Sequence, residues 1–101
     1  MDLDTLADRV MLRCETYNGS LHVDQRSGGV VYPDAPAFTL DVDRALSASE
    51  RAELDRILRG VYLNYNEHLG EDDGLAYSLS FLYSEGTNGT ILEVWPDPTE
   101  F

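Results

Sequence analysis

The chain contains no lysine, only one cysteine and no apolar run longer than four residues. One thiol cannot form an internal disulfide, and Cys14 falls at an apolar position of an expected helix, so we interpret it as a small buried side chain. Without a long apolar run, the chain has neither a membrane span nor the apolar middle of a signal peptide. These absences predict a cytoplasmic protein that does not enter membranes.

Signatures of catalysis and of metal binding are also missing. There is no Gly-x-Ser-x-Gly motif, and no Cys and His stand together as a nucleophile and its base. His68 and Glu71 are three residues apart, but no second His at ligand spacing accompanies them. Asp72-Asp73-Gly74 lacks the alternating acids and final Glu of a calcium loop. We therefore expect no enzymatic activity, no metal ion and no cofactor.

Negative charge is what the chain has in excess, with nineteen Asp and Glu against seven Arg and a net charge of −12. Residues 1–43 hold eight acids and three Arg, residues 44–59 hold three acids and four Arg, and residues 60–101 hold eight acids and no Arg. Such a chain repels nucleic acid and anionic membranes and favours a protein partner with a basic surface. The alternative is a general acidic composition, from coding bias or a salty cytoplasm, in a domain of unknown role.

The length allows one domain over residues 1–101, and the residue patterns predict an α+β fold. Apolar residues recur every three or four positions in the helices and alternate in the strands. The expected order is α-β-β-β-α-β-β, namely a helix over 2–17, strands over 21–24, 30–32 and 38–43, a helix over 48–68, and strands over 75–83 and 90–95. We expect an antiparallel sheet with the long second helix packed on one face and a loose tail over 96–101.

The long second helix is the element with the strongest start signal. Ser47 and Glu50 form a capping-box pattern, in which each side chain bonds the backbone amide of the other. An apolar stripe then follows at helical spacing, and Gly70 provides the stop. The stripe consists of Leu54, Ile57, Leu58, Val61, Tyr65 and Leu69.

The last two strands are expected to form a hairpin with Asn88-Gly89 at the centre of the turn. In that register Tyr83 faces Val94 and Leu82 faces Trp95. Leu82, Ile91 and Trp95 then point away from the Tyr and Phe face, next to Glu93. An aromatic residue in an apolar patch with a carboxylate rim is typical of a binding surface. The alternative is that the first helix packs over these residues.

Two functions fit these patterns. One is a small inhibitor that blocks a basic, nucleic-acid-binding surface of another protein by charge mimicry, as anti-restriction, anti-CRISPR and toxin-immunity proteins do. The other is an acidic chaperone or adaptor that holds another polypeptide in an apolar groove. The α-β-β-β-α-β-β order resembles that of class I type III secretion chaperones, although their final helix is missing here.

The expected partner is a protein with a basic surface, bound without direct contact to nucleic acid or membrane, and a homodimer is the other assembly considered. The partner-binding residues are drawn from the cation-free part of the chain and from the outer face of the last hairpin. They are Glu67, Glu71, Asp72, Asp73, Leu82, Glu85, Glu93 and Trp95.

Overall fold

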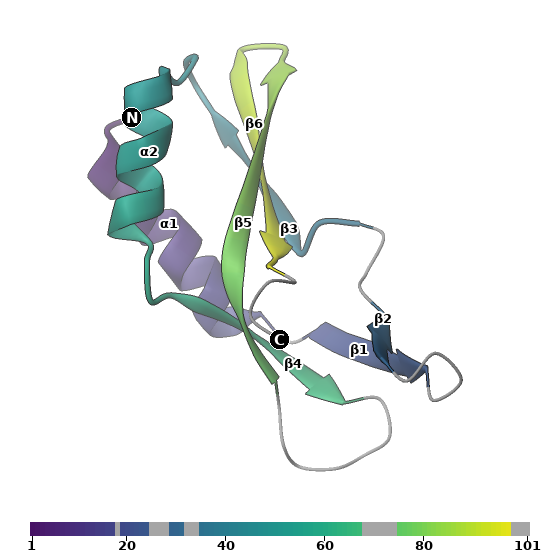
Figure 1. The fold of residues 1–101 in the computed structure, drawn as a ribbon. Helices are drawn as coiled ribbons and strands as arrows, with labels where there is room; N and C mark the ends of the chain where they lie inside the picture. Colours follow the sequence, from purple (N-terminus) through teal and green to yellow (C-terminus); the bar gives the residue numbers. More distant parts are fainter. Residues whose placement is uncertain (18, 25–28, 32–34, 68–74, 98–101) are drawn as a thin grey trace.

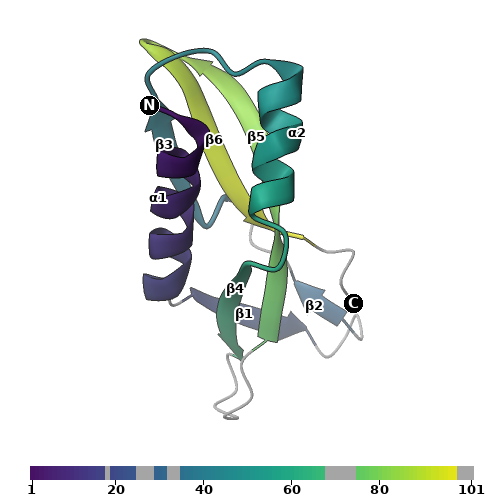
Figure 2. The same cartoon turned by 90° about the vertical axis from the view of Figure 1, so that its left-hand side faces the viewer.

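The structure is a computed structural model that describes residues 1–17, 19–24, 29–31, 35–67 and 75–97. Within these ranges it is an α+β domain whose two helices lie on one side of a β-sheet (Figure 1). The elements are α1 (Leu3–Thr16), β1 (Gly19–Asp24), β2 (Gly29–Val31), β3 (Phe38–Val42), α2 (Ala48–Ile57), β4 (Tyr62–Glu67), β5 (Leu75–Gly86) and β6 (Gly89–Pro96). Seen from the helix side, α1 and α2 stand next to each other in front of β3, β6 and β5 (Figure 2).

Helix α1 forms as its sequence predicts. The Asp2 carboxylate accepts a hydrogen bond of 2.7 Å from the Thr5 amide, which satisfies one of the free donors at the helix start. The residues at helical spacing, Leu6, Val10 and Cys14, are all buried. Cys14 is therefore a core side chain, as predicted, and burial raises the pKa of its thiol to about 11.

Helix α2 begins as predicted but is much shorter. The capping box is present, with the Glu50 amide donating to Ser47 Oγ at 3.2 Å and the Ser47 amide donating to Glu50 Oε1 at 3.1 Å. The helix ends at Ile57 rather than near residue 68. Gly60, whose φ of +89° suits glycine, turns the chain away from the helix axis.

The prediction of a long second helix is wrong because residues 62–67 form strand β4 instead. Val61, Leu63 and Tyr65 are spaced by two, so the apolar positions after Gly60 fit a strand as well as a helical stripe. Two tyrosines also favour the extended conformation. Long-range pairing decides between the two, because Leu63 pairs with Tyr77 of β5 and both side chains are fully buried. The predicted stop at Gly70 lies outside the described residues.

The strands form one sheet in the order β2-β1-β4-β5-β6-β3. The four strands β4, β5, β6 and β3 are antiparallel to their neighbours in this group, as predicted. At the β4 side, β1 joins the sheet in a parallel arrangement, and β2 pairs antiparallel with β1. The expectation of a purely antiparallel sheet is thus wrong at β1, which pairs in parallel with β4. The sequence pattern did not predict β4, so this pairing could not be predicted either.

The β5–β6 hairpin is shifted by two residues from the predicted register. Gly86 pairs with Gly89, so Thr87-Asn88 occupies the turn, and Leu82 faces Glu93 rather than Trp95. Likewise Tyr83 faces Leu92 rather than Val94. Because the shift is even, every side chain keeps the face predicted for it.

The end of β6 differs from the loose tail expected over 96–101. Pro96 is buried and is the last residue of β6, where it pairs with Leu79. The Asp97 amide continues the ladder by donating to the Ser78 carbonyl at 2.8 Å. The remaining tail residues lie outside the described part of the chain.

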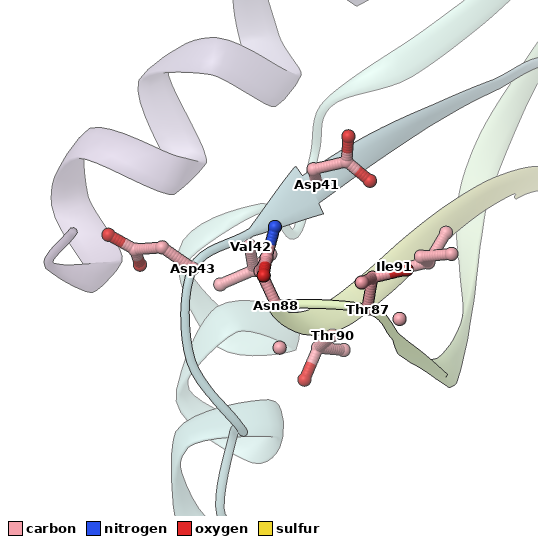
Figure 3. Close-up of a pocket in the computed structure, with 9 residues that line it drawn as sticks. Asp41, Val42, Asp43, Thr87, Asn88, Thr90 and Ile91 are labelled. Carbon is pink, nitrogen blue, oxygen red and sulfur yellow. The ribbon is translucent and has the colours of Figure 1, made fainter.

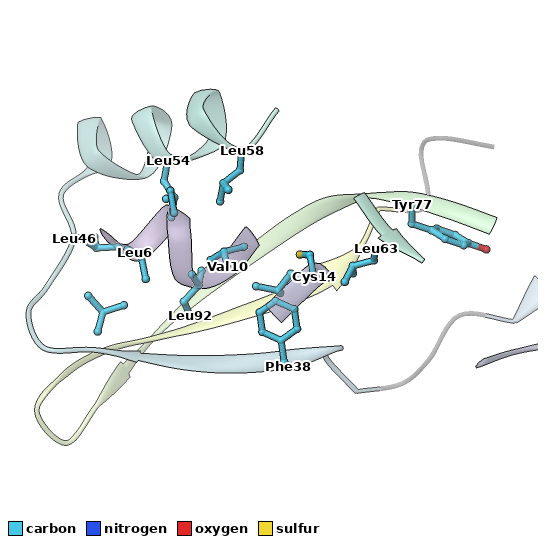
Figure 4. Close-up of a cluster of buried hydrophobic side chains, with 13 residues drawn as sticks. Leu6, Val10, Cys14, Phe38, Leu46, Leu54, Leu58, Leu63, Tyr77 and Leu92 are labelled. Atoms are coloured by element: carbon cyan, nitrogen blue, oxygen red, sulfur yellow. The ribbon is translucent and has the colours of Figure 1, made fainter. Parts of the chain in front are cut away.

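The hydrophobic core lies between the helices and the sheet (Figure 4). Leu6 and Val10 of α1, Leu54 of α2 and Leu92 and Val94 of β6 expose at most 1% of their surface. Burying each such side chain stabilises the fold by about 1.5–3 kcal/mol. The apolar faces of both helices therefore pack against the same side of the sheet, and neither helix packs against the other side of the sheet.

Candidate partner-binding face

The sheet surface that faces away from the helices is the first candidate, and we call it the outer face. Alternation along β6 buries Leu92 and Val94 on the helix side and sends Ile91, Glu93 and Trp95 to the other side, where each is half-buried. The neighbouring strands add partners in register. These are Ser80, Leu82 and Ser84 from β5 and Thr39 and Asp41 from β3.

Glu93 and Trp95 form a linked pair at the centre of this face. The indole Nε1–H of Trp95 donates a hydrogen bond of 3.0 Å to Glu93 Oε1. Glu93 sits opposite Leu82 on one side and opposite Thr39 on the other. Leu82 exposes 55% of its surface, which makes it one of the most exposed large apolar residues described. The outer face therefore combines an aromatic ring, an exposed aliphatic side chain and a carboxylate held in place.

The described arginines lie away from this face. The arginines in the described part of the chain lie on the helices or close to the ends of α2, where several are engaged locally: Arg44 pairs with Glu50 at 2.6 Å and Arg56 pairs with Glu53. On the outer face the described charged side chains are Asp41 and Glu93. Among the described residues, the outer face therefore carries negative charge only.

The predicted partner-binding residues do not all gather at one place. Leu82, Glu93 and Trp95 share the outer face. Glu85 is exposed near the hairpin tip but, by alternation with Tyr83, belongs to the helix side of β5. Glu67 is the last residue of β4.

The remaining predicted acids, Glu71, Asp72 and Asp73, lie outside the described residues. The alternative in which the first helix covers the outer face is wrong, since α1 lies on the same side of the sheet as α2 (Figure 2).

A hollow of about 400 Å³ lies at the tip of the β5–β6 hairpin, beside the end of β3 (Figure 3). It is lined by polar groups that include Asp41, Asp43, Asn88 and Thr90. Asp41, Asp43 and Thr90 point in three different directions, so their oxygen atoms do not converge on one ligand (Figure 3). Among the described residues no three His, Cys, Asp or Glu side chains come close enough together to hold a metal ion.

Two more hollows, which the sequence did not reveal, lie on either side of the α2–β4 connection. One, of about 370 Å³, lies beside the end of α2 and the middle of β5, and the other, of about 390 Å³, lies between α1 and β4. Val61 and Tyr62 line both, and Tyr62 exposes 46% of its surface. The hollow between α1 and β4 has a mainly apolar lining, whereas polar and apolar groups share the lining of the hollow beside α2. Val61 and Tyr62 were missed as lining residues because the sequence pattern placed them in the long second helix.

Tyr83 is a phenol whose pKa is shifted by its surroundings. Its ring packs under Arg51, whose Cζ lies 4.6 Å from the ring centroid. Its hydroxyl oxygen is buried and has no hydrogen-bond partner among the described residues. Burial, with a smaller effect from the Asp55 carboxylate, raises the pKa of Tyr83 to about 12. Tyr83 therefore contributes to the packing of α2 on β5 while its hydroxyl opposes that packing.

Tyr83→Phe should remove an unsatisfied buried hydroxyl and raise the free energy of unfolding at neutral pH by about 1 kcal/mol. The pKa of Tyr83 in the folded protein exceeds the usual value of about 10, so ionisation of this phenol opposes folding. The wild type should therefore keep its full free energy of unfolding below pH 10 and lose part of it as the pH rises through 12. The variant should therefore lose less stability over this range in chemical denaturation. Tyr62→Phe, at an exposed phenol, is the control. An equal alkaline loss in the wild type and Tyr83→Phe would contradict this account.

None of the described helices is long and apolar enough to cross a bilayer. The described side chains provide one face suited to protein binding, with an aromatic anchor and acidic groups, and two hollows beside Tyr62. Comparison of the chain with protein-family models, with curated proteins and with solved structures finds no match.

Proposed function

We propose that this is a non-enzymatic cytoplasmic protein that binds a basic surface on another protein and blocks it against nucleic acid. The supporting observation is the outer face, where Asp41 and Glu93 accompany exposed Leu82 and half-buried Trp95 and no described cation is present. Carboxylates can occupy a Lys- and Arg-rich groove that otherwise binds phosphates. The apolar side chains add the desolvated anchors that usually carry most of the binding energy.

The proposed mechanism is competition. The net charge of −12 attracts a basic partner and raises the association rate by about 10–1000-fold at low salt. Once bound, Trp95 and Leu82 exclude water from the contact, and Glu93 is already oriented by its hydrogen bond to the indole. The acids at 67 and 71–73 are proposed to extend the contact. Inhibitors of restriction, CRISPR or toxin proteins use this kind of competition.

The two hollows beside Tyr62 favour a second candidate function, a chaperone or adaptor that holds an extended apolar segment of another polypeptide. Met11, Val61 and Ala76 contribute to the mainly apolar lining of the hollow between α1 and β4. Such a contact is mainly apolar, so its affinity should change little with salt. This difference separates the two candidates.

The test is a pull-down from the native lysate, followed by calorimetry of the recovered partner at increasing salt. If the charges on the outer face carry the binding, we expect the affinity to fall at least about tenfold between about 0.05 and 0.5 M salt. Over the same range the melting temperature of the free protein should rise, because salt screens its internal repulsion. An affinity that stays flat or rises would reject charge mimicry and favour the adaptor.

A further inference from the structure

Strand β5 is longer than the strands beside it, and this leaves part of its edge open. Over Leu79–Gly86 it pairs with β6 on one side. On the other side it pairs with β4 only over Leu75–Ser78. No other described strand continues this side, so from Leu79 onward every second residue of β5 directs its amide and carbonyl away from the sheet.

The sequence of β5 along this open edge lacks the side chains that usually protect edge strands. Natural sheets block such edges with short strands, prolines or charged side chains, especially lysine. Over Leu79–Ser84 the side chains of β5 are apolar, tyrosine or serine, and the first charge is Glu85 near the turn. The opposite edge of the sheet, β3, has only five residues and carries Asp41. The open edge of β5 therefore carries less protection against strand addition than the edge formed by β3.

Space for an added strand exists beside this edge. In Figure 2, α2 stands on the side of β5 that is turned away from β6. The hollow of about 370 Å³ lies there, and polar and apolar groups share its lining: Leu58, Val61, Leu79 and Phe81 are apolar, and Asp55, Arg59, Tyr62 and Ser78 are polar. A side chain pointing toward α2 from an added strand would enter this hollow. On the other side of that strand, the nearest β5 side chains are Ser80, Leu82 and Ser84.

We propose that the open edge of β5 captures an extended segment of another polypeptide, which adds a strand to the sheet under α2. Main-chain hydrogen bonds then provide the affinity, and alternate side chains provide the specificity. This surface is distinct from the outer-face contact of the proposed function and does not depend on it.

Charge complementarity defines the occupant. Residues of the added strand that face α2 lie toward Leu58, Val61 and Phe81 in the hollow, so apolar side chains suit these positions. Residues that face the other way lie beside the uncharged side chains Ser80, Leu82 and Ser84, and the net charge of −12 favours basic side chains at these positions. The occupant is therefore a strand in which apolar and basic residues alternate. A second copy of this chain is disfavoured, because each copy carries a net charge of −12.

The test uses synthetic peptides of alternating valine and lysine, blocked at both ends and long enough to span Leu79–Gly86, at concentrations up to about 1 mM. N-methylation removes a backbone donor, so we prepare two forms, each methylated at one alternating set of residues. Strand addition predicts that one form binds at least about tenfold more weakly than the other. Amide exchange by NMR should show every second amide of residues 79–85 exchanging rapidly in the free protein and more slowly with the peptide bound.

Controls separate this site from the outer face. Trp95→Ala, which impairs the proposed outer-face contact, should bind the peptide as the wild type does. A peptide of alternating valine and glutamate should bind at least about tenfold more weakly. Equal binding of the two methylated forms, or no slowing of exchange in β5 at any peptide concentration, would overturn the proposal. Protection of these amides that grows with protein concentration alone would instead identify a second copy as the occupant and reject the captured peptide.

Discussion

Gly89→Ala is expected to lower the free energy of unfolding by about 3 kcal/mol, a large effect for one added methyl group. The φ of Gly89 is +155°, which side chains rarely adopt. A Cβ at this position would also lie 2.6 Å from the Arg44 amide nitrogen and in contact with the Val42 carbonyl. These are backbone atoms at the end of β3, so they cannot move aside as a flexible side chain would. The substitution should push β3 away from the hairpin.

Gly60→Ala is the matched control, because Gly60 also has a positive φ, +89°, but no atom lies within 4 Å of the place that an added Cβ would occupy. This substitution should lower the free energy of unfolding by only about 1 kcal/mol, from backbone strain alone. Urea denaturation of the two variants and the wild type gives both values. If Gly89→Ala costs no more than Gly60→Ala, the close approach of β3 to the hairpin does not determine the stability of this corner.

The same glycine explains why the hairpin register could be predicted only in part. Asn-Gly is the usual centre of a two-residue turn, and no local pattern indicates a different place for Gly89. In the structure Gly89 is instead required where β3 passes close to β6, a contact between segments far apart in the chain. The alternation of Leu82, Glu93 and Trp95 was nevertheless enough to assign their face, since an even shift leaves each side chain on the same side.

Local signals predicted the parts of the fold that depend on local physics. The Ser47–Glu50 capping box and the spacing of Leu6, Val10 and Cys14 need only neighbouring residues, and both are present. The strand at 62–67 depends on pairing with β5, which no local pattern shows. Gly60 was the overlooked signal, because a glycine at this position ends a helix as readily as Gly70 would.

The candidate site, too, could be predicted only where it depends on neighbouring residues. Trp95 and Leu82 were found because alternation is local, whereas the hollows beside Tyr62 form between three elements and have no signature in the sequence. Glu85 was included for its charge alone. Alternation from Tyr83 would have placed it on the helix side, away from Leu82 and Trp95.

Trp95→Ala is expected to weaken binding of the basic partner by about 30-fold or more, the loss typical of an aromatic anchor at the centre of an interface. Removing the half-buried ring also costs stability, so binding must be compared under conditions in which circular dichroism shows the variant to be folded. Leu82→Ala and Leu12→Ala form a matched pair, since the two leucines expose 55% and 61% of their surfaces but lie on opposite layers. Only Leu82→Ala should weaken binding. Equal effects from these two variants would remove the outer face from the proposal.

The pairing of Trp95 with Glu93 allows the contributions of charge and of the aromatic ring to be measured separately. Glu93→Gln keeps an oxygen that can accept from the indole Nε1–H but removes the carboxylate charge. It should therefore preserve most of the apolar contact, weaken binding by about 3–10-fold, and reduce the dependence of affinity on salt. Trp95→Phe keeps an aromatic ring and the charge but loses the indole donor, so its salt dependence should match that of the wild type. If instead Glu93→Gln leaves both affinity and salt dependence unchanged, the carboxylate serves only to orient Trp95, and the partner is recognised through apolar contacts rather than through mimicry of phosphate.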